Sequence, residues 1–455
     1  MRFLNSFCKK TQKYLDLQKF GSTLQVISLL PMYTTFRPLL ASKPLIGIFG
    51  NGLSGKGTAH LCEKLHLPYE MIDERQQSQS PHFERYGLCV FSPGFQPNHP
   101  WRQEAQKVNV LSVTELDFAA SCFQNPVIAV TGTNGKTSVT EILAQLLHNS
   151  GKEVLSVGNN GTVLSEVVAN GGLSSNGIYI CEVSSFQAQF LKFLHPTYTL
   201  WTNFAPDHLN WHGNLKNYFE AKYRLLKLTE KTCFCGNSLK ETFQTFTVPS
   251  SAASVIFAPP AEELNDWLAQ FPLCFSQGQR ENFALVHTFA QQLKISEATL
   301  RRTLEEFQQP PHRLHCCRRI GEISFWNDSK GTNLHAAQAA LESLKNLPNL
   351  WWILGGGGKG EDLNGFIQTL NRYPVQTVCL VGETGRELMQ KASEFKANVI
   401  HAEILPKVFE HLPIHKTFTL VLSPGFTSWD QFKSFEERGE LFEKLVRDYV
   451  PSSGS

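Results

Sequence analysis

The chain has 455 residues, which at roughly 150 residues per domain suggests about three domains. Hydrophobic residues make up 42% of the chain, so it can bury several cores and is not a disordered protein. The net charge of +2 excludes binding of nucleic acid by bulk electrostatics, and any anion site must be local. No apolar run is long enough to span a membrane. The cysteines are scattered without a C-x-x-C pair, which indicates a reduced, cytoplasmic protein without a zinc knuckle.

The beginning of the chain differs from the rest. Residues 1–42 are basic with a short apolar stretch, and we expect them to form a poorly ordered extension. We also expect that deletion of residues 1–40 leaves folding and activity near normal. From residue 43 the chain repeats an apolar strand, a glycine-rich turn and an amphipathic helix, with domains expected at 43–117, 118–307 and 308–455. Strands that alternate with helices predict an α/β fold of parallel sheets covered on both faces.

The apolar runs locate the main strands and one helix. Strands are predicted at 44–49, 127–130, 178–183, 198–204, 323–326, 350–354, 375–381 and 417–422. After the second of these, Val139, Ile142, Leu143, Leu146 and Leu147 lie on one face at helical spacing. Gly151 is placed to end that helix.

The segment Thr-Gly-Thr-Asn-Gly-Lys-Thr at 131–137 is the sharpest chemical signal. It joins a predicted buried strand to a helix start, where free backbone N–H groups and the helix dipole favour a phosphate. Lys136 can reach terminal phosphates, and the Thr137 hydroxyl can bind Mg²⁺. Only two residues separate Gly132 from Gly135, so this is not the standard P-loop, and the alternative is a plain strand-to-helix turn.

A second glycine-rich turn lies near the start of the first predicted domain. Residues 50–55 fit G-x-G-x-x-G after a strand, and Asp73 follows 18 residues after Gly55. This is the spacing of a dinucleotide fingerprint, in which the acid binds a ribose. A UDP-sugar would satisfy it as well as NAD, and a purely structural turn is the alternative.

Further polar groups follow the other predicted strands. Glu182 and the pair Asp207-His208 stand at strand ends, where a carboxylate and an imidazole suit a metal–phosphate site. His208 and His212 are four residues apart, but Gly213 and the absence of HExxH argue against zinc. The segments 328–333, 355–359 and 422–439 place hydroxyl, charged and glycine residues after three strands of the last domain.

These segments together resemble the Mur ligase family, the ATP-dependent amide ligases of peptidoglycan synthesis, over about residues 47–448. The matching blocks, in the order of the family, are 130–138, 182–187, 203–208 and 327–333. The blocks 354–359 and 423–439 are similar to the branch that adds D-glutamate. The Asp-Asn-Pro-Arg turn of the members that add diaminopimelate or lysine is missing.

The resemblance implies three domains: an N-terminal Rossmann-like UDP-binding domain, a central P-loop-type ATPase domain and a C-terminal Rossmann-like domain. It implies a ligase that uses ATP and Mg²⁺ to add D-glutamate to UDP-N-acetylmuramoyl-L-alanine through an acyl phosphate. We expect a monomer in the bacterial cytoplasm, without nucleic acid or membrane as a partner.

The resemblance also carries roles onto matching positions. The UDP-sugar would be bound by Leu53, Ser54, Asp73, Arg75, Ser92, Pro93, Gly94, Asn159 and Gln187. ATP would be bound by Gly132, Thr133, Asn134, Gly135, Lys136, Thr137, Ser138, Asn282, Arg313 and Asp328. D-glutamate would be bound by His312, Lys330, Thr332, Lys359, Ser428 and Phe435. The catalytic residues would be Lys136, Glu182, His208 and Lys222; the last three, with Thr137, would hold the metal, and Lys222 would be carbamylated.

Two positions depart from the family pattern. The block 278–282 is shortened, and only Asn282 matches a residue that meets adenine; Glu74 stands where a small hydroxyl residue is common. Folylpolyglutamate synthase shares the ATP loop but lacks a UDP domain ahead of it, and a different Mur ligase is a further alternative. A dehydrogenase would leave the ATP loop unexplained. A non-catalytic nucleotide-binding scaffold is the alternative if Lys222 or His208 is not placed at the site.

Overall fold

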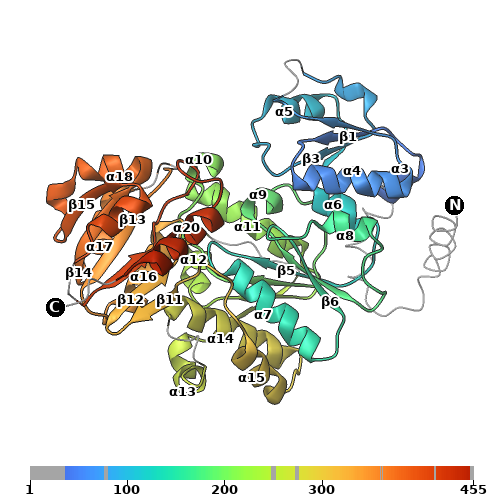
Figure 1. Cartoon of the computed structure of the whole chain (residues 1–455). Helices are drawn as coiled ribbons and strands as arrows, with labels where there is room; N and C mark the ends of the chain where they lie inside the picture. Colours follow the sequence, from blue (N-terminus) through green and yellow to red (C-terminus); the bar gives the residue numbers. More distant parts are fainter. Residues whose placement is uncertain are drawn as a thin grey trace.

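The computed structural model describes residues 36–75, 80–246, 253–271, 276–358, 360, 362–413 and 417–450, apart from the side chain of Arg37. Three sheets follow one another along the chain (Figure 1), each flanked by helices. Among the helices of these ranges, none has the length and apolar character needed to cross a bilayer.

The N-terminal sheet is parallel, with the order β2-β1-β3-β4. Its strands are β1 (Ile46–Phe49), β2 (Tyr69–Ile72), β3 (Leu88–Phe91) and β4 (Ser112–Val113). The accompanying helices are α3 (Arg37–Ala41), α4 (Leu53–Leu65), η3 (Phe83–Arg85) and α5 (Pro100–Lys107). All four residues of β1 and of β3 are buried, as expected for strands covered on both faces.

The central sheet is parallel throughout, with the order β10-β9-β8-β5-β7-β6. Its strands are β5 (Val127–Thr131), β6 (Val154–Gly158), β7 (Ile178–Glu182), β8 (Tyr198–Trp201), β9 (Thr232–Cys235) and β10 (Ser254–Phe257). Its helices are α6 (Glu115–Ala120), α7 (Lys136–Asn149), α8 (Leu164–Ala169), α9 (Ser185–Ala188), α10 (Leu209–His212), α11 (Leu215–Leu228), α12 (Leu239–Thr245), η4 (Ala261–Leu264), α13 (Asn265–Leu268), α14 (Gln277–Gln292) and α15 (Glu297–Glu306).

The C-terminal sheet has the order β11-β12-β16-β13-β14-β15, and β11 pairs antiparallel with β12. Its strands are β11 (His315–Ile320), β12 (Ile323–Asn327), β13 (Leu350–Gly355), β14 (Val375–Val381), β15 (Asn398–Glu403) and β16 (Thr419–Leu422). Its helices are α16 (Leu334–Leu344), α17 (Leu363–Leu370), α18 (Gly382–Met389), η6 (Ala392–Glu394), α19 (Leu405–Glu410) and α20 (Phe435–Asp448).

The predicted α/β class with parallel sheets is confirmed, and each predicted strand corresponds to an observed one. The strand predicted at 198–204 ends earlier, at Trp201, because the next residues turn to bond the loop after β5. Thr133, for example, donates its backbone N–H to the Asn203 carbonyl. Helix α7 buries all five predicted apolar residues, and Gly151 follows its end with a φ of +78°.

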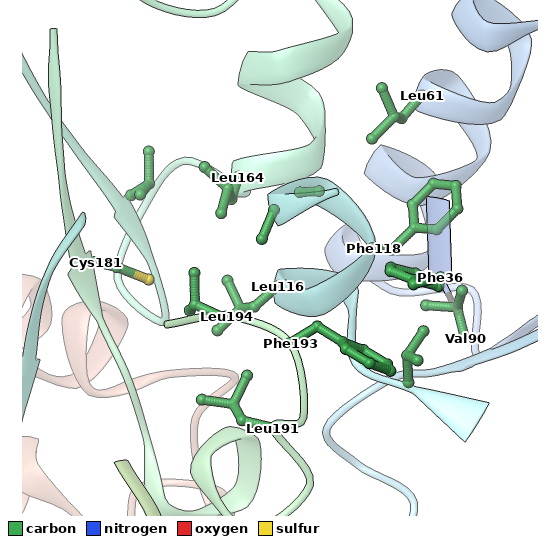
Figure 2. Close-up of a cluster of buried hydrophobic side chains, with 14 of the residues drawn as sticks. Phe36, Leu61, Val90, Leu116, Phe118, Leu164, Cys181, Leu191, Phe193 and Leu194 are labelled. Atoms are coloured by element: carbon green, nitrogen blue, oxygen red, sulfur yellow. The ribbon is translucent and has the colours of Figure 1, made fainter. Parts of the chain in front are cut away.

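The first two sheets share one hydrophobic core. Figure 2 shows Leu61 of α4, Val90 of β3 and Cys181 of β7 grouped around Leu116 and Phe118 of α6, all of them buried. The predicted boundary between 117 and 118 lies inside α6, and the domain limits as such stay predictions. The C-terminal sheet has two cores of its own, built from residues after 313.

The end of the predicted extension belongs to the fold. Residues 37–41 form helix α3, and the Phe36 ring is fully buried and stacked on Phe193, with 4.8 Å between the ring centroids. The expectation of poor order over 1–42 is therefore wrong for residues 36–42, because a large ring here fills the shared core. Residues 1–35 lie outside the described residues.

Candidate active site

The loop between β5 and α7 is built for close backbone contacts. Gly132 has a φ of +150°, and a Cβ atom there would lie 1.9 Å from the Thr202 hydroxyl. Gly135 has a φ of +82°, and a Cβ atom there would lie 2.5 Å from Oδ1 of Asn282. Only glycine fits both positions, so the loop curls tightly and opens the N-terminus of α7 to an anion. Thr133 in this loop and Ser138 in the first turn of α7 are both buried.

Two lysines converge on this loop. Lys136 Nζ donates to the carbonyl oxygens of Gly132 at 3.0 Å and Thr133 at 2.9 Å. Lys222, on α11, donates from Nζ to the same Gly132 oxygen at 2.6 Å and is 1% exposed. Burial, and next the positive charge of Lys136, hold the pKa of Lys222 well below its usual range. A buried amine whose pKa is lowered in this way loses its proton more readily than an exposed lysine.

Glu182 lies beside the loop with one free carboxylate oxygen. Its side chain is 2% exposed, and Oε1 accepts a hydrogen bond from Nδ2 of Asn159 at 3.0 Å. The other oxygen, Oε2, is buried and has no hydrogen-bond partner among the described residues. Because an orphaned buried carboxylate oxygen is costly, its presence indicates a cation or donor that binds there.

His208 sits at the end of the segment after β8 in a left-handed conformation, with a φ of 54°. Its Nε2 lies 3.6 Å from Oδ2 of Asp207, and its ring centroid lies 4.7 Å from that of Phe186. Among the described residues no three His, Cys, Asp or Glu side chains form a metal-ligand cluster. Of the four predicted metal ligands, only Glu182 and His208 belong to these residue types. The other two are a threonine and a lysine.

The C-terminal part reaches across to the same loop. Lys330 Nζ donates to the Thr137 hydroxyl at 3.3 Å and lies 4.7 Å from the centroid of the Phe435 ring. Burial, with the nearby Arg313 charge, lowers the pKa of Lys330 to about 7. Burial raises the pKa of Asp328 to about 7, although Oδ2 accepts from the Ser423 hydroxyl at 2.7 Å.

Other predicted residues of the C-terminal part lie around this contact. Arg313 is close enough to Glu182 and Asp328 for charge interactions, and burial lowers its pKa. Its Nε atom is buried and has no hydrogen-bond partner among the described residues. His312 is buried, with Nδ1 2.9 Å from Nδ2 of Asn327. Ser428 is buried and Thr332 half-buried, whereas Lys359 lies outside the described residues.

A cavity of about 560 Å³ borders the start of α7. It is lined by Thr137, Glu141, Ala144, Gln145, Asn160, Glu306, Phe307, Gln308 and Pro310. The cavity therefore lies where α7 meets the connection into the C-terminal part, next to the predicted phosphate and metal site.

The predicted nucleotide turns of the N-terminal sheet lie against each other. Gly50 has a φ of +104°, and a Cβ atom there would lie 2.6 Å from the Ser92 hydroxyl. That hydroxyl oxygen is buried and has no hydrogen-bond partner among the described residues. The loops after β1 and β3 thus form one surface, which carries Leu53 (73% exposed), Ser54, Pro93 and Gly94. Such an arrangement at the carboxyl ends of parallel strands suits a nucleotide.

The acid after β2 is held by a neighbouring arginine. Arg75 Nη2 lies 2.6 Å from Asp73 Oδ2, and its Nε donates to Oδ1 at 3.0 Å. These bonds lower the pKa of Asp73 to about 2, so the carboxylate stays ionised. Glu74, which departs from the family pattern, pairs with Nε2 of His99 at 2.7 Å.

Two residues predicted to bind the UDP-sugar, Asn159 and Gln187, make hydrogen bonds within the protein. Asn159 donates its backbone N–H as well as its Nδ2 to Glu182. Gln187 Oε1 accepts from the Ser184 N–H at 3.0 Å and completes a capping box at the start of α9. Their contact with a UDP-sugar stays a prediction.

Comparisons with known proteins identify the family. The Mur ligase middle domain matches residues 130–296, and the Mur ligase glutamate ligase domain matches residues 312–419. A UDP-N-acetylmuramoylalanine–D-glutamate ligase of Desulfitobacterium hafniense is 33% identical, covering 79% of this chain and 83% of the relative. The ligase of the same name from Aquifex aeolicus is 30% identical, covering 88% and 97%. The chain belongs to the Mur ligase family.

Solved structures agree on the fold. The UDP-N-acetylmuramate-alanine ligase of Thermotoga maritima has a TM-score of 0.54 at 15% identity, over 89% of this chain and 99% of that one. The MurF ligase of the same organism, in complex with ADP, has a TM-score of 0.55 at 16% identity, over 79% and 96%. Membership of the Mur ligase family favours a ligase over the dehydrogenase and scaffold alternatives.

One buried residue of this Mur ligase was not singled out from the sequence. Arg438, on α20, is 2% exposed and donates from Nη2 to the Ser329 carbonyl at 2.8 Å and from Nη1 to the Thr427 carbonyl at 3.0 Å. It therefore joins the loops that carry Lys330 and Ser428. The signal available in the sequence was its place in the block 423–439.

Proposed function

We propose that this Mur ligase joins D-glutamate to UDP-N-acetylmuramoyl-L-alanine at the expense of ATP, as a monomer in the bacterial cytoplasm. The observation that carries the proposal is the convergence of Glu182, Lys222 and Lys330 on the phosphate-type loop before α7. The names of the relatives support the choice of substrates.

In the first step an oxygen of the UDP-sugar's alanyl carboxylate attacks the γ-phosphorus of ATP, and ADP leaves. The backbone N–H groups at 132–138 bind the phosphates, and Lys136 turns from the loop carbonyls to the transferred phosphoryl group. Asn282, buried against Gly135, supports this loop from α14, and its contact with adenine stays a prediction. Arg313 and Asp328 approach from the C-terminal side.

The residues at the loop fit a divalent cation. The orphaned Oε2 of Glu182 offers an anionic oxygen, Thr137 offers a hydroxyl, and His208 an imidazole. Lys222 would fit once carbamylated: its nitrogen would form a bond to the carbon of CO₂ and release a proton to solvent, which leaves an anionic carbamate oxygen as a ligand. Burial lowers the pKa of this lysine and so favours the amine form that the step needs. Mg²⁺ bound by these residues would neutralise the charge of the phosphates.

In the second step the amine of D-glutamate attacks the carbonyl carbon of the acyl phosphate. The tetrahedral intermediate loses a proton from nitrogen and expels inorganic phosphate, which leaves the amide. Lys330 and Lys359 suit the carboxylates of the amino acid, while His312, Thr332, Ser428 and Phe435 complete the pocket. Because acyl phosphates hydrolyse, the C-terminal part has to cover the loop during this step.

An amino-acid panel tests the proposal. Purified protein is given ATP, Mg²⁺ and UDP-N-acetylmuramoyl-L-alanine with one amino acid at a time, and phosphate and product mass are measured. We expect amide formation with D-glutamate far above L-glutamate, L-lysine or diaminopimelate. Faster product formation with one of the other amino acids would assign the protein to a different branch of the family, and product from a folate substrate would favour a folylpolyglutamate synthase.

A further inference from the structure

Asn333 lies where helix α16 of the C-terminal sheet meets the central part of the chain, and it has none of the predicted site roles. It is the N-cap of α16, and its Oδ1 accepts a hydrogen bond from the Ala336 N–H at 2.9 Å. The residue is 4% exposed. A cap of this kind needs only a side-chain oxygen, which serine or aspartate also supplies.

The remaining atoms of the same carboxamide cross to the central part of the chain. Asn333 Nδ2 donates to Oδ1 of Asn134 at 3.3 Å and to Oδ2 of Asp207 at 3.0 Å. Asn134 returns a bond from its Nδ2 to Oδ1 of Asn333, also at 3.3 Å. Both hydrogens of the Asn333 amide and both lone pairs of its oxygen are therefore occupied.

The partners of Asn333 belong to the phosphate-binding side of the site. Asn134 lies in the loop after β5, where its backbone N–H donates to Oδ1 of Asn203 at 2.9 Å. Asp207 precedes His208 and accepts that residue's backbone N–H at 2.8 Å. Nδ2 of Asn134 also lies 3.0 Å from Nδ1 of His335, one residue into α16 beyond Leu334. The start of α16 thus contacts the loop and the His208 turn together.

We propose that Asn333 is a positioning residue, which couples docking of the C-terminal sheet to the shape of the phosphate-binding loop. The inference rests on the proposed function. It assumes that Asn333 stabilises the state in which the C-terminal part covers the loop and protects the acyl phosphate from water. When the C-terminal part lifts away, the Asn134 side chain and the Asp207 carboxylate each lose their hydrogen bond to Asn333, and water reaches the loop.

Two substitutions separate this role from helix capping. Asn333→Asp keeps the volume and the cap, but replaces the Nδ2 donor by an oxygen that faces Oδ1 of Asn134 and the Asp207 carboxylate. Asn333→Ser keeps the cap and removes the bridge. If Asn333 serves only as a cap, both variants behave as the wild type, since all three residues are good N-caps.

The readout is the amount of phosphate released per amide formed. We expect a ratio near one for the wild type, and a ratio raised roughly tenfold in Asn333→Asp, with a smaller rise in Asn333→Ser. Melting temperatures close to the wild type show that both variants fold. A ratio unchanged in both folded variants overturns the proposal.

A double variant tests whether the repulsion from Asp207 is the cause. Asp207→Asn in the Asn333→Asp background restores a donor opposite the new carboxylate, so the ratio should fall back toward that of Asp207→Asn alone. Effects that simply add would exclude a direct contact between the two side chains.

A structural measurement keeps this inference apart from the proposed function. Small-angle X-ray scattering of each protein with a non-hydrolysable ATP analogue should give a larger radius of gyration for Asn333→Asp than for the wild type. If the wild type forms no amide with D-glutamate, the proposed function fails. The difference in radius of gyration still tests whether Asn333 holds the C-terminal part against the loop. Equal radii would overturn it.

Discussion

Lys222 shows how a single buried side chain takes its chemistry from its surroundings. An exposed lysine is protonated and would repel Mg²⁺, whereas this amine is buried beside Lys136 and its pKa lies far below the usual value. The hydrogen bond to the Gly132 carbonyl places it at the phosphate-binding loop. Burial and the Lys136 charge favour the neutral amine that carbamylation would require, and the hydrogen bond holds that amine at the loop.

We therefore predict that Lys222→Ala cuts turnover steeply, while ATP and the UDP-sugar still bind with near-normal affinity. The loss falls on the transition state because the metal loses one ligand there. Steady-state kinetics and calorimetric titration measure the two effects, and a small carboxylic acid in solution should restore part of the activity. Near-normal turnover of Lys222→Ala, or an uncarbamylated Lys222 in the protein with bicarbonate and Mg²⁺, would contradict the assignment.

Lys330 makes stability depend on pH. Its folded-state pKa is about 7, against 10.5 for the ordinary side chain, because burial and the nearby Arg313 charge disfavour the ammonium form. Between these two values the unfolded chain binds more protons than the folded one, so stability rises with pH. Below pH 7 the side chain is protonated in both states, so the folded protein bears the full free-energy cost of burying the ammonium group.

We expect Lys330→Met to remove this contribution. The variant should gain stability over the wild type most at pH 6, and the gain should shrink as the pH rises through 7 to 9. Urea unfolding at several pH values measures the difference. A gain that is independent of pH would show that Lys330 is fully charged in the folded protein.

At the scale of the element, helix α3 ties the start of the described chain to the shared core. Phe36 precedes it and is stacked on Phe193 (Figure 2). Leu39 and Leu40 pack against the same core. Deletion of residues 1–40 removes Phe36, so we expect this deletion to destabilise the fold.

We predict that Phe36→Ala lowers the free energy of unfolding by roughly 3–5 kcal/mol, as for other buried phenylalanines. Val450→Ala, at a side chain that is 80% exposed, is the matched control and should be near neutral. Chemical denaturation measures both. A change below about 1 kcal/mol for Phe36→Ala would show that the ring contributes little to the core.

At the scale of the whole molecule, the hydrophobic cores divide the chain into two parts. The shared core joins β1, β3 and α4 to β5 and β7, whereas the cores of the C-terminal sheet contain only residues after 313. Side-chain hydrogen bonds of Lys330, Asn333 and His335 link the C-terminal part to the loop after β5 and to the start of α7. Polar contacts of this kind are weaker than a shared core.

We predict that the N-terminal and central sheets unfold together and the C-terminal sheet separately. Native-state hydrogen exchange should give one common opening free energy for the amides of β1, β3, β5 and β7, and another for those of β12, β13 and β16. Independent opening of the N-terminal sheet would show instead that the three predicted domains are separate cooperative units.

The sequence alone determined the local features of this protein. Apolar runs predicted β1, the strands β5, β7 and β8, and the four inner strands of the C-terminal sheet, because strands buried on both faces have to be hydrophobic throughout. The edge strands escaped prediction, and so did the inner strands β3 and β9, although both are buried throughout. A half-exposed strand such as β2 or β15 carries a weaker pattern. Strands of four residues such as β3 and β9 are too short to be assigned from periodicity alone. The glycines at 132 and 135 indicated a phosphate loop, because only glycine permits such close backbone contacts.

Tertiary structure alone decided which of these features meet. Lys222 lies 90 residues from Gly132 and Lys330 lies 193 residues from Thr137, yet each pair shares a hydrogen bond. No periodicity in the chain reports such pairings, because they depend on how sheets and helices pack. The orphaned oxygen of Glu182, the bridge of Asn333 and the burial of Phe36 have the same origin: each is a property of the surroundings and not of the residue.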